Sequence, residues 1–166
     1  MHALLHPLLT LILTLFATTV ALSAEESTTT PAVYRPERHP GFLSTIKAMN
    51  GDIDLVCIGD SITEGWRKSG KEIWDKNFAP LKALNLGLGG DKTQGVLYRL
   101  QNGQLDGYKA KLFMVMIGTN NREPAEDVSR GIKAIINEIQ AKQPRAKILL
   151  LGLFPRGASS AEIEGM

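Results

Sequence analysis

Three short segments of the chain combine glycine with groups that could act in catalysis. They are GDS at 59–61, GLGGD at 87–91 and GTNN at 118–121. The hydroxyl of Ser61 could attack a carbonyl carbon. Its backbone N–H, a glycine N–H of the second segment and an asparagine amide of the third could bind the oxyanion that forms. Together the segments predict a serine nucleophile with an oxyanion hole of three donors.

Each segment has a simpler explanation when it stands alone. Serine is a preferred helix N-cap, so GDS could merely start a helix, and the other two segments could be turns. The glycines at 59 and 65 do not have the G-x-S-x-G spacing of the α/β-hydrolases. Residues 87–91 lack the full G-x-G-x-x-G pattern, which disfavours a dinucleotide site. The catalytic interpretation therefore depends on the three segments meeting in space.

The elements between these segments predict that they do meet. Short, continuously apolar runs are typical of buried parallel strands, and they cover residues 53–58, 83–86, 112–117 and 148–153. Helices are predicted within 62–78, over 93–100 and after Pro124, where one apolar stripe comprises Val128, Ile132, Ile135, Ile136 and Ile139. Alternating strands and helices form a parallel sheet covered on both faces, and ligands bind at the carboxyl ends of its strands. Each segment follows one of the first three strands.

Four ordered blocks, from about residue 41 to 157, resemble the GDSL/SGNH hydrolases: IGDSITEGW, ALNLGLGGDKTQGVLYRL, IGTNN and GIKAII…ILLLGLFPRG. Within that family the chain is most similar to the catalytic subunits of platelet-activating-factor acetylhydrolase and to related bacterial esterases. The resemblance implies a three-layer α/β/α flavodoxin-like fold. It also implies hydrolysis of carboxylic esters, often acetyl esters, without a metal or other cofactor.

The same resemblance implies roles for individual residues. Ser61 is the nucleophile and also donates its backbone N–H, Gly90 supplies a second N–H, and Asn120 supplies its side-chain amide. Asp60, together with Gly59 before it, would support the serine turn. These five residues are the predicted site.

The base that this family uses is missing from the sequence. In the family a histidine activates the serine and an aspartate three residues earlier orients it, in a D-x-x-H motif near the C-terminus. The only histidines here are His2, His6 and His39, and none follows Ser61. We therefore expect a C-terminally truncated domain that lacks the last strand and the catalytic loop, with weak activity or none.

No other residue is expected to replace the missing base. His39 would have to reach Ser61 from the opposite side of the domain. Cys57 lies inside the first predicted strand and is expected to be a small core residue. Glu64 is one helical turn beyond Ser61 and is predicted to be a solvated helix residue.

The N-terminal part predicts export. Residues 1–24 carry no Asp, Glu, Lys or Arg, and the apolar block at 8–16 is followed by small residues, as in a secretory signal peptide. The alternative is an uncleaved membrane anchor over residues 3–22. Either way the folded part would be periplasmic or extracellular. Residues 25–40 are rich in Ser, Thr, Pro and charge and predict a flexible linker, which leaves 41–166 as the incomplete hydrolase domain.

Composition limits the possible partners. The 166 residues have a net charge of +2 with dispersed lysines, which argues against nucleic-acid binding, and one cysteine cannot form an internal disulfide. The expected partner is a small ester, either an acetylated sugar or a lipid, and no oligomeric state is predicted. Two alternatives to the esterase stay open. They are a non-catalytic ligand-binding protein on the same scaffold and a remnant that does not fold.

Overall fold

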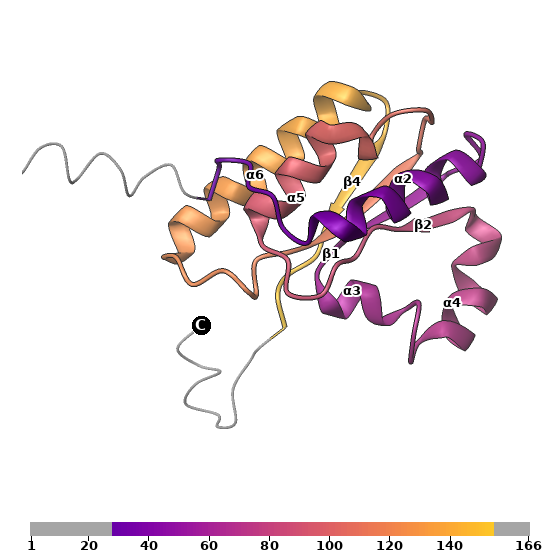
Figure 1. The fold of residues 1–166 in the computed structure, drawn as a ribbon, viewed down its shortest axis with the longest axis horizontal. Helices are drawn as coiled ribbons and strands as arrows, with labels where there is room; N and C mark the ends of the chain where they lie inside the picture. The colour runs from indigo at the N-terminus through magenta and orange to yellow at the C-terminus, as the bar shows by residue number, and fades with distance from the viewer. Residues whose placement is uncertain (1–27, 155–166) are drawn as a thin grey trace, which may run out of the picture.

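Four parallel strands form the central sheet of the structure, a computed structural model that describes residues 28–154 (Figure 1). The strand order is β2-β1-β3-β4. The strands are β1 Leu55–Gly59, β2 Ala83–Asn85, β3 Leu112–Met116 and β4 Lys147–Leu150. Each of them overlaps one of the four predicted apolar runs.

β1 is the centre of the sheet and is buried along its whole length. The register places Leu55 opposite Ala83 on one side and opposite Leu112 on the other. A continuously apolar run suits this position because helices cover both faces of the strand. β4 pairs with β3 in the described part of the chain, and three of its four residues are exposed.

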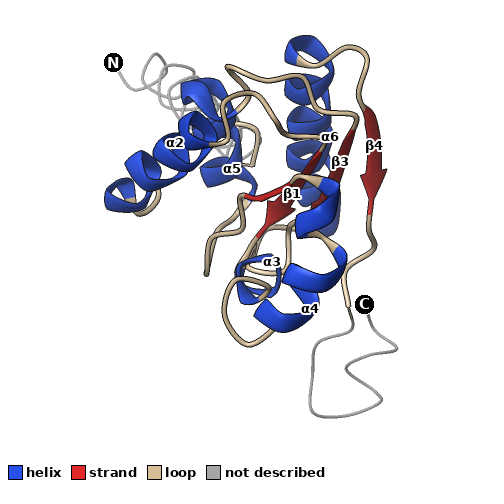
Figure 2. Cartoon of the chain, turned by 90° about the vertical axis from the view of Figure 1, so that its right-hand side faces the viewer, coloured by secondary structure: helices blue, strands red, loops and turns tan. Residues whose placement is uncertain are grey.

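Helices cover both faces of the sheet, which confirms the predicted α/β/α layering (Figures 1 and 2). α2, α5 and α6 lie on one face, and α3 and α4 lie on the other. The helices are α2 His39–Ala48, α3 Ser61–Gly65, α4 Lys71–Asn77, α5 Thr93–Arg99 and α6 Ala125–Lys142. Short 3-10 turns cover Pro36–Arg38 and Ala79–Leu81, and a π-helical turn covers Leu100–Gln104.

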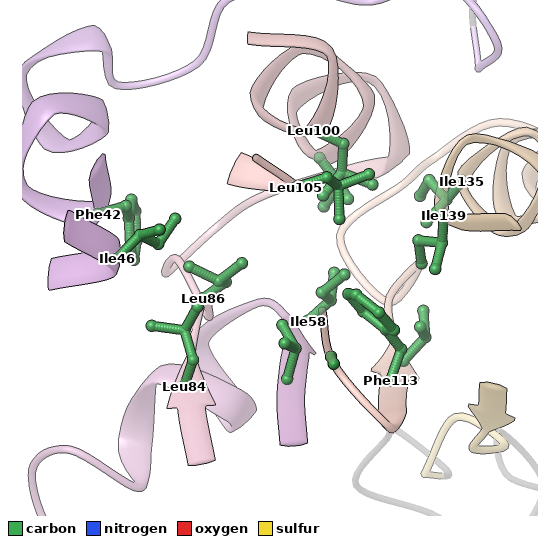
Figure 3. Close-up of a cluster of buried hydrophobic side chains, with 14 of the residues drawn as sticks. Phe42, Ile46, Ile58, Leu84, Leu86, Leu100, Leu105, Phe113, Ile135 and Ile139 are labelled. Carbon is green, nitrogen blue, oxygen red and sulfur yellow. The ribbon is translucent and has the colours of Figure 1, made fainter. Parts of the chain in front are cut away.

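The main core lies between the sheet and α2, α5 and α6 (Figure 3). Phe113 and Ile135 are fully buried there, and burying an apolar side chain of this size contributes about 1.5–3 kcal/mol. A smaller cluster on the opposite face contains Cys57 and Trp74, and Trp74 stacks on Phe78 with ring centres 5.1 Å apart. Cys57 is therefore a core residue, as predicted, and burial raises the pKa of its thiol to about 12.

The region 62–78, predicted to contain one helix, forms two. α3 ends at Gly65, and α4 begins directly after Gly70. A side chain on Gly70 would lie 2.8 Å from the ring of Trp66, so glycine allows the chain to turn back over the indole. This turn accounts for the irregular spacing of the apolar residues in this region.

Residues 28–40 differ from the flexible linker predicted over 25–40. Thr28 is buried, and its hydroxyl donates a 2.6 Å hydrogen bond to the carbonyl oxygen of Asp127 in α6. The predicted domain boundary at residue 41 falls inside α2. Composition alone could not show this, because hydroxyl and backbone hydrogen bonds hold the segment in place and leave no apolar pattern.

The predicted signal peptide or anchor at 1–24 lies outside the described residues. Within 28–154, no helix combines the length and the apolar character that crossing a bilayer requires. The export prediction therefore depends on the sequence alone.

Candidate active site

The three predicted segments meet at the carboxyl edge of the sheet, beyond β1, β2 and β3. A Cβ atom on Gly89 would lie 3.8 Å from the Cβ atom of Ser61. The side-chain amide of Asn120 donates to the carbonyl oxygen of Asp91 at 2.9 Å. Residues 87–91, called the glycine loop below, therefore contact both of the other segments, as the catalytic interpretation requires.

Ser61 is the first residue of α3 and is exposed to solvent. Asp60 caps this helix, because its Oδ1 accepts the backbone N–H of Ile62 at 2.9 Å. The alternative in which Ser61 serves only as the N-cap is therefore wrong, and its hydroxyl is not needed to start the helix. Its backbone N–H belongs to the first helical turn, where N–H groups have no partner inside the helix.

Gly59 and Asp60 are buried beneath Ser61. A methyl group on Gly59 would lie 2.6 Å from the carbonyl oxygen of Met116 in β3 and would overlap the hydroxyl of Thr63. Asp60 is only 1% exposed. A larger residue at 59 would push the serine turn away from β3, which is the physical reason for the supporting role expected of this pair.

Polar side chains fix the glycine loop at both ends. At its start, Asn85 accepts the N–H of Gly87 at 2.9 Å and donates to a carbonyl oxygen of α3 at 2.7 Å. Gly90 has a φ of +80°, in the left-handed region that glycine adopts without strain. At its end, Asp91 forms a buried ion pair with Arg99 at 2.6 Å.

The second asparagine of GTNN holds its own segment. Oδ1 of Asn121 accepts the N–H of Thr93 at 3.2 Å, and Nδ2 donates to Gln94 and Glu123, each at 3.1 Å. GTNN is thus tied to the start of α5, and Asn120 is the asparagine that reaches the glycine loop. A side-chain amide has two N–H donors, of which the hydrogen bond to that loop uses one.

Glu64 contacts the predicted site, although no spacing pattern in the sequence indicates this contact. The prediction of a solvated residue is wrong, because the short helix α3 packs against the glycine loop and leaves Glu64 only 5% exposed. Its Oε2 accepts the N–H of Gly89 at 2.7 Å. Burial would raise the pKa of this carboxyl, but hydrogen bonds from Arg38, Gly89 and Lys68 outweigh it and lower the pKa to about 2. Glu64 is therefore ionised at neutral pH.

His39 is not placed to act as the base. Its Nε2 lies 2.8 Å from the carbonyl oxygen of Asn102, and its ring centre is 6.1 Å from that of Tyr98. Tyr98 lies near the C-terminal end of α5 and Asn102 in the π-helical turn that follows it, whereas Ser61 lies beside the loop that leads to the N-terminal end of α5. The other two histidines lie outside the described residues. Within the described part, no three His, Cys, Asp or Glu side chains are grouped as a metal site needs.

Comparison with known proteins identifies the family. The model of the GDSL-like lipase/acylhydrolase family matches residues 57–165. The chain belongs to this family. A stretch of 105 residues is 50% identical to platelet-activating factor acetylhydrolase IB subunit alpha2 and 48% identical to subunit alpha1, both from Homo sapiens. This stretch covers 63% of the chain and 45% of each relative, so the chain spans about half the length of the curated relatives it matches.

A solved structure supports the family fold. A GDSL-like lipase from Bacteroides thetaiotaomicron has a TM-score of 0.60 to this chain and is 17% identical, covering 76% of this chain and 63% of that one. At that identity the likeness concerns the fold alone. The flavodoxin-like fold implied by the resemblance is confirmed, and the roles of Ser61, Gly90 and Asn120 in this GDSL-family chain stay predictions.

Proposed function

We propose that the chain carries the nucleophile and the oxyanion hole of a serine ester hydrolase, with Ser61 attacking the carbonyl carbon of a carboxylic ester. Membership of the GDSL-like lipase/acylhydrolase family supports this class of reaction. The observation that carries the proposal is that one loop, which contains Gly90, lies beside Ser61 and accepts a hydrogen bond from Asn120. A carbonyl group bound there could meet the nucleophile and the donors at once.

The reaction would pass through an acyl-enzyme. As the bond from Oγ to the carbonyl carbon forms, the serine proton moves to a base and the carbonyl oxygen becomes an oxyanion. The backbone N–H groups of Ser61 and Gly90 and the amide of Asn120 would donate to that oxygen. The intermediate then expels the alcohol, which takes the proton from the base. Water releases the acid from the serine by the same steps.

The base is the part of this reaction that the chain does not supply. No histidine follows Ser61 in the 166 residues. Without a base the serine hydroxyl is a weak nucleophile, and only a residual rate from the oxyanion hole and substrate binding is expected. The chain by itself should therefore have weak activity, which a soluble base should increase.

The class of substrate is proposed from the relatives. Two of them carry the name platelet-activating factor acetylhydrolase. We propose that the chain acts on short acyl esters, above all acetyl esters, of a lipid or a sugar. Export to the periplasm or the exterior is a separate proposal, and only residues 1–24 support it.

Release of 1-naphthol from 1-naphthyl acetate tests the proposed function. The wild-type chain, Ser61→Ala and the control Ser69→Ala are assayed with and without imidazole as the soluble base. Because Ser69 is an exposed residue outside the three segments, its variant should behave like the wild type. Subtracting the Ser61→Ala rate removes direct attack by imidazole on the ester. We expect a remaining rate that rises with imidazole, and a folded chain with no such rate contradicts the proposal.

A non-catalytic ligand-binding protein on the same scaffold is the second candidate. In it, the three segments that meet at the carboxyl edge of the sheet bind a ligand without cleaving it. It predicts that the folded chain binds an uncleaved acetyl ester, measured by calorimetry, and that imidazole produces no turnover dependent on Ser61.

A further inference from the structure

The glycine loop has little rigidity of its own. Gly87, Gly89 and Gly90 fall within four residues, and glycine has the widest choice of backbone conformations. An oxyanion donor must nevertheless point to one place before the reaction starts. Side chains from outside the loop therefore have to set the direction of the Gly90 N–H.

Glu64 holds the N–H side of Gly89. The two carboxylate oxygens have different partners, because Oε2 accepts the N–H of Gly89 at 2.7 Å and Oε1 accepts the guanidinium of Arg38 at 2.9 Å. Lys68 also lies 3.4 Å from Oε1. Arg38 thus fixes the carboxylate that fixes the loop.

Tyr34 holds the carbonyl side of Gly89. Its hydroxyl donates to that carbonyl oxygen at 3.3 Å, and the same hydroxyl would overlap any side chain placed on Gly90. The carbonyl of Gly89 and the N–H of Gly90 belong to one peptide group. In a trans peptide these two bonds point in opposite directions, so a carbonyl held toward Tyr34 directs the Gly90 N–H away from it.

We infer that Tyr34 and Glu64, the latter held by Arg38, are positioning residues that set the direction of the Gly90 N–H. The role of that N–H in an oxyanion hole rests on the proposed function. Tyr34 and Arg38 both precede the body of α2, in the part of the chain where Thr28 is bonded to α6. Residues 28–38 are therefore a structural part of the site.

The full chain with Tyr34→Phe or Glu64→Gln tests this inference. Tyr34→Phe removes the hydroxyl alone and keeps the ring. Glu64→Gln keeps one side-chain oxygen that can accept the N–H of Gly89. Its amide NH2 group then faces the guanidinium of Arg38, and two donors cannot form a hydrogen bond with each other. The matched controls are Tyr98→Phe, whose ring faces His39, and Glu72→Gln, which changes an exposed residue in the first turn of α4.

Backbone 15N relaxation measures the mobility of the Gly90 N–H and needs no turnover. We expect its order parameter to fall from about 0.85, the value of a rigid backbone, to below about 0.6 in both variants and to stay unchanged in both controls. Because Tyr34→Phe preserves the packing of the ring, it should stay folded even where Glu64→Gln does not. An unchanged order parameter in folded Tyr34→Phe overturns the inference for the hydroxyl.

Turnover of 1-naphthyl acetate with imidazole provides the second readout. We expect kcat to fall roughly tenfold with KM within about twofold of the wild type, because the lost alignment acts on the oxyanion. A raised KM with unchanged kcat overturns the inference. If the wild-type chain shows no turnover dependent on Ser61, the proposed function fails, and the relaxation data still decide whether Tyr34 and Glu64 position Gly90.

Discussion

Glu64 makes the stability of the fold depend on pH in a predictable direction. Burial would raise the pKa of its carboxyl above the ordinary 4.5, but hydrogen bonds from Arg38, Gly89 and Lys68 lower it to about 2 in the folded protein. A carboxyl whose pKa is lower in the folded state stabilises the protein above the unfolded pKa. That contribution is lost as the pH falls through the folded pKa. The relevant range is therefore from about pH 5 down to pH 2.

The size of the effect follows from the two pKa values. The change from 4.5 to about 2 corresponds to about 3 kcal/mol of unfolding free energy at neutral pH. The side chain of Glu64 is only 6% exposed, but those of Arg38 and Lys68 are 39% and 70% exposed, so solvent screens part of this contribution and about 3 kcal/mol is its upper limit. The linkage relation assigns about 2 kcal/mol of it to the interval between pH 6 and pH 3.

Urea unfolding of the wild-type chain and Glu64→Gln at pH 6 and pH 3 measures this contribution. The other carboxylates are common to both proteins, so the difference in unfolding free energy isolates Glu64. We expect that difference to shrink by up to about 2 kcal/mol from pH 6 to pH 3. Glu72→Gln, which changes an exposed glutamate of α4, is measured in the same way as the matched control. A wild-type minus Glu64→Gln difference that is the same at both pH values refutes the reasoning.

Gly59→Ala should lower stability by about 1–3 kcal/mol in calorimetry, because the added methyl group would overlap Thr63, and an unchanged thermal midpoint contradicts this. Asp91→Asn should lower the unfolding free energy in urea by about 3–5 kcal/mol, because it leaves the buried guanidinium of Arg99 without its carboxylate. A loss below about 1 kcal/mol would show that the pair matters little. Leu150 is 48% exposed on β4, so we expect the wild-type chain to self-associate through this strand. Leu150→Lys should then scatter less light than the wild type at the same concentration. Equal scattering by the two proteins would exclude β4 as the contact.

The layers and the strand positions could be predicted because they follow from apolar patterning. β1 is buried on both faces, and its residues form a continuous apolar run that is easily read in the sequence. The same logic placed Cys57 in the core. The order of strands and loops also allowed the prediction that Ser61 and the glycine loop share one edge of the sheet, since parallel strands end together.

The contacts that hold the site could not be predicted in this way. Glu64 meets Gly89 across 25 residues of sequence, and Tyr34 meets the same glycine across 55. Single polar contacts of this kind leave no periodic pattern, and the composition of residues 25–40 favoured a flexible chain. The burial of Glu64 escapes prediction for the same reason, because it depends on a loop that comes much later in the chain.

The position of Tyr34 and Arg38 bears on which part of the chain makes the site. The family model begins its match at residue 57, so it contains Ser61, Gly90 and Asn120 but neither of these two side chains. The glycine loop, however, has one hydrogen bond from Tyr34 and a second from its own N–H to Glu64, whose carboxylate Arg38 holds. Without residues 28–38 the glycine loop would have the same sequence. It would lose the Tyr34 hydroxyl that donates to the carbonyl oxygen of Gly89. The inferred direction of the Gly90 N–H thus depends on a segment that lies outside the matched region.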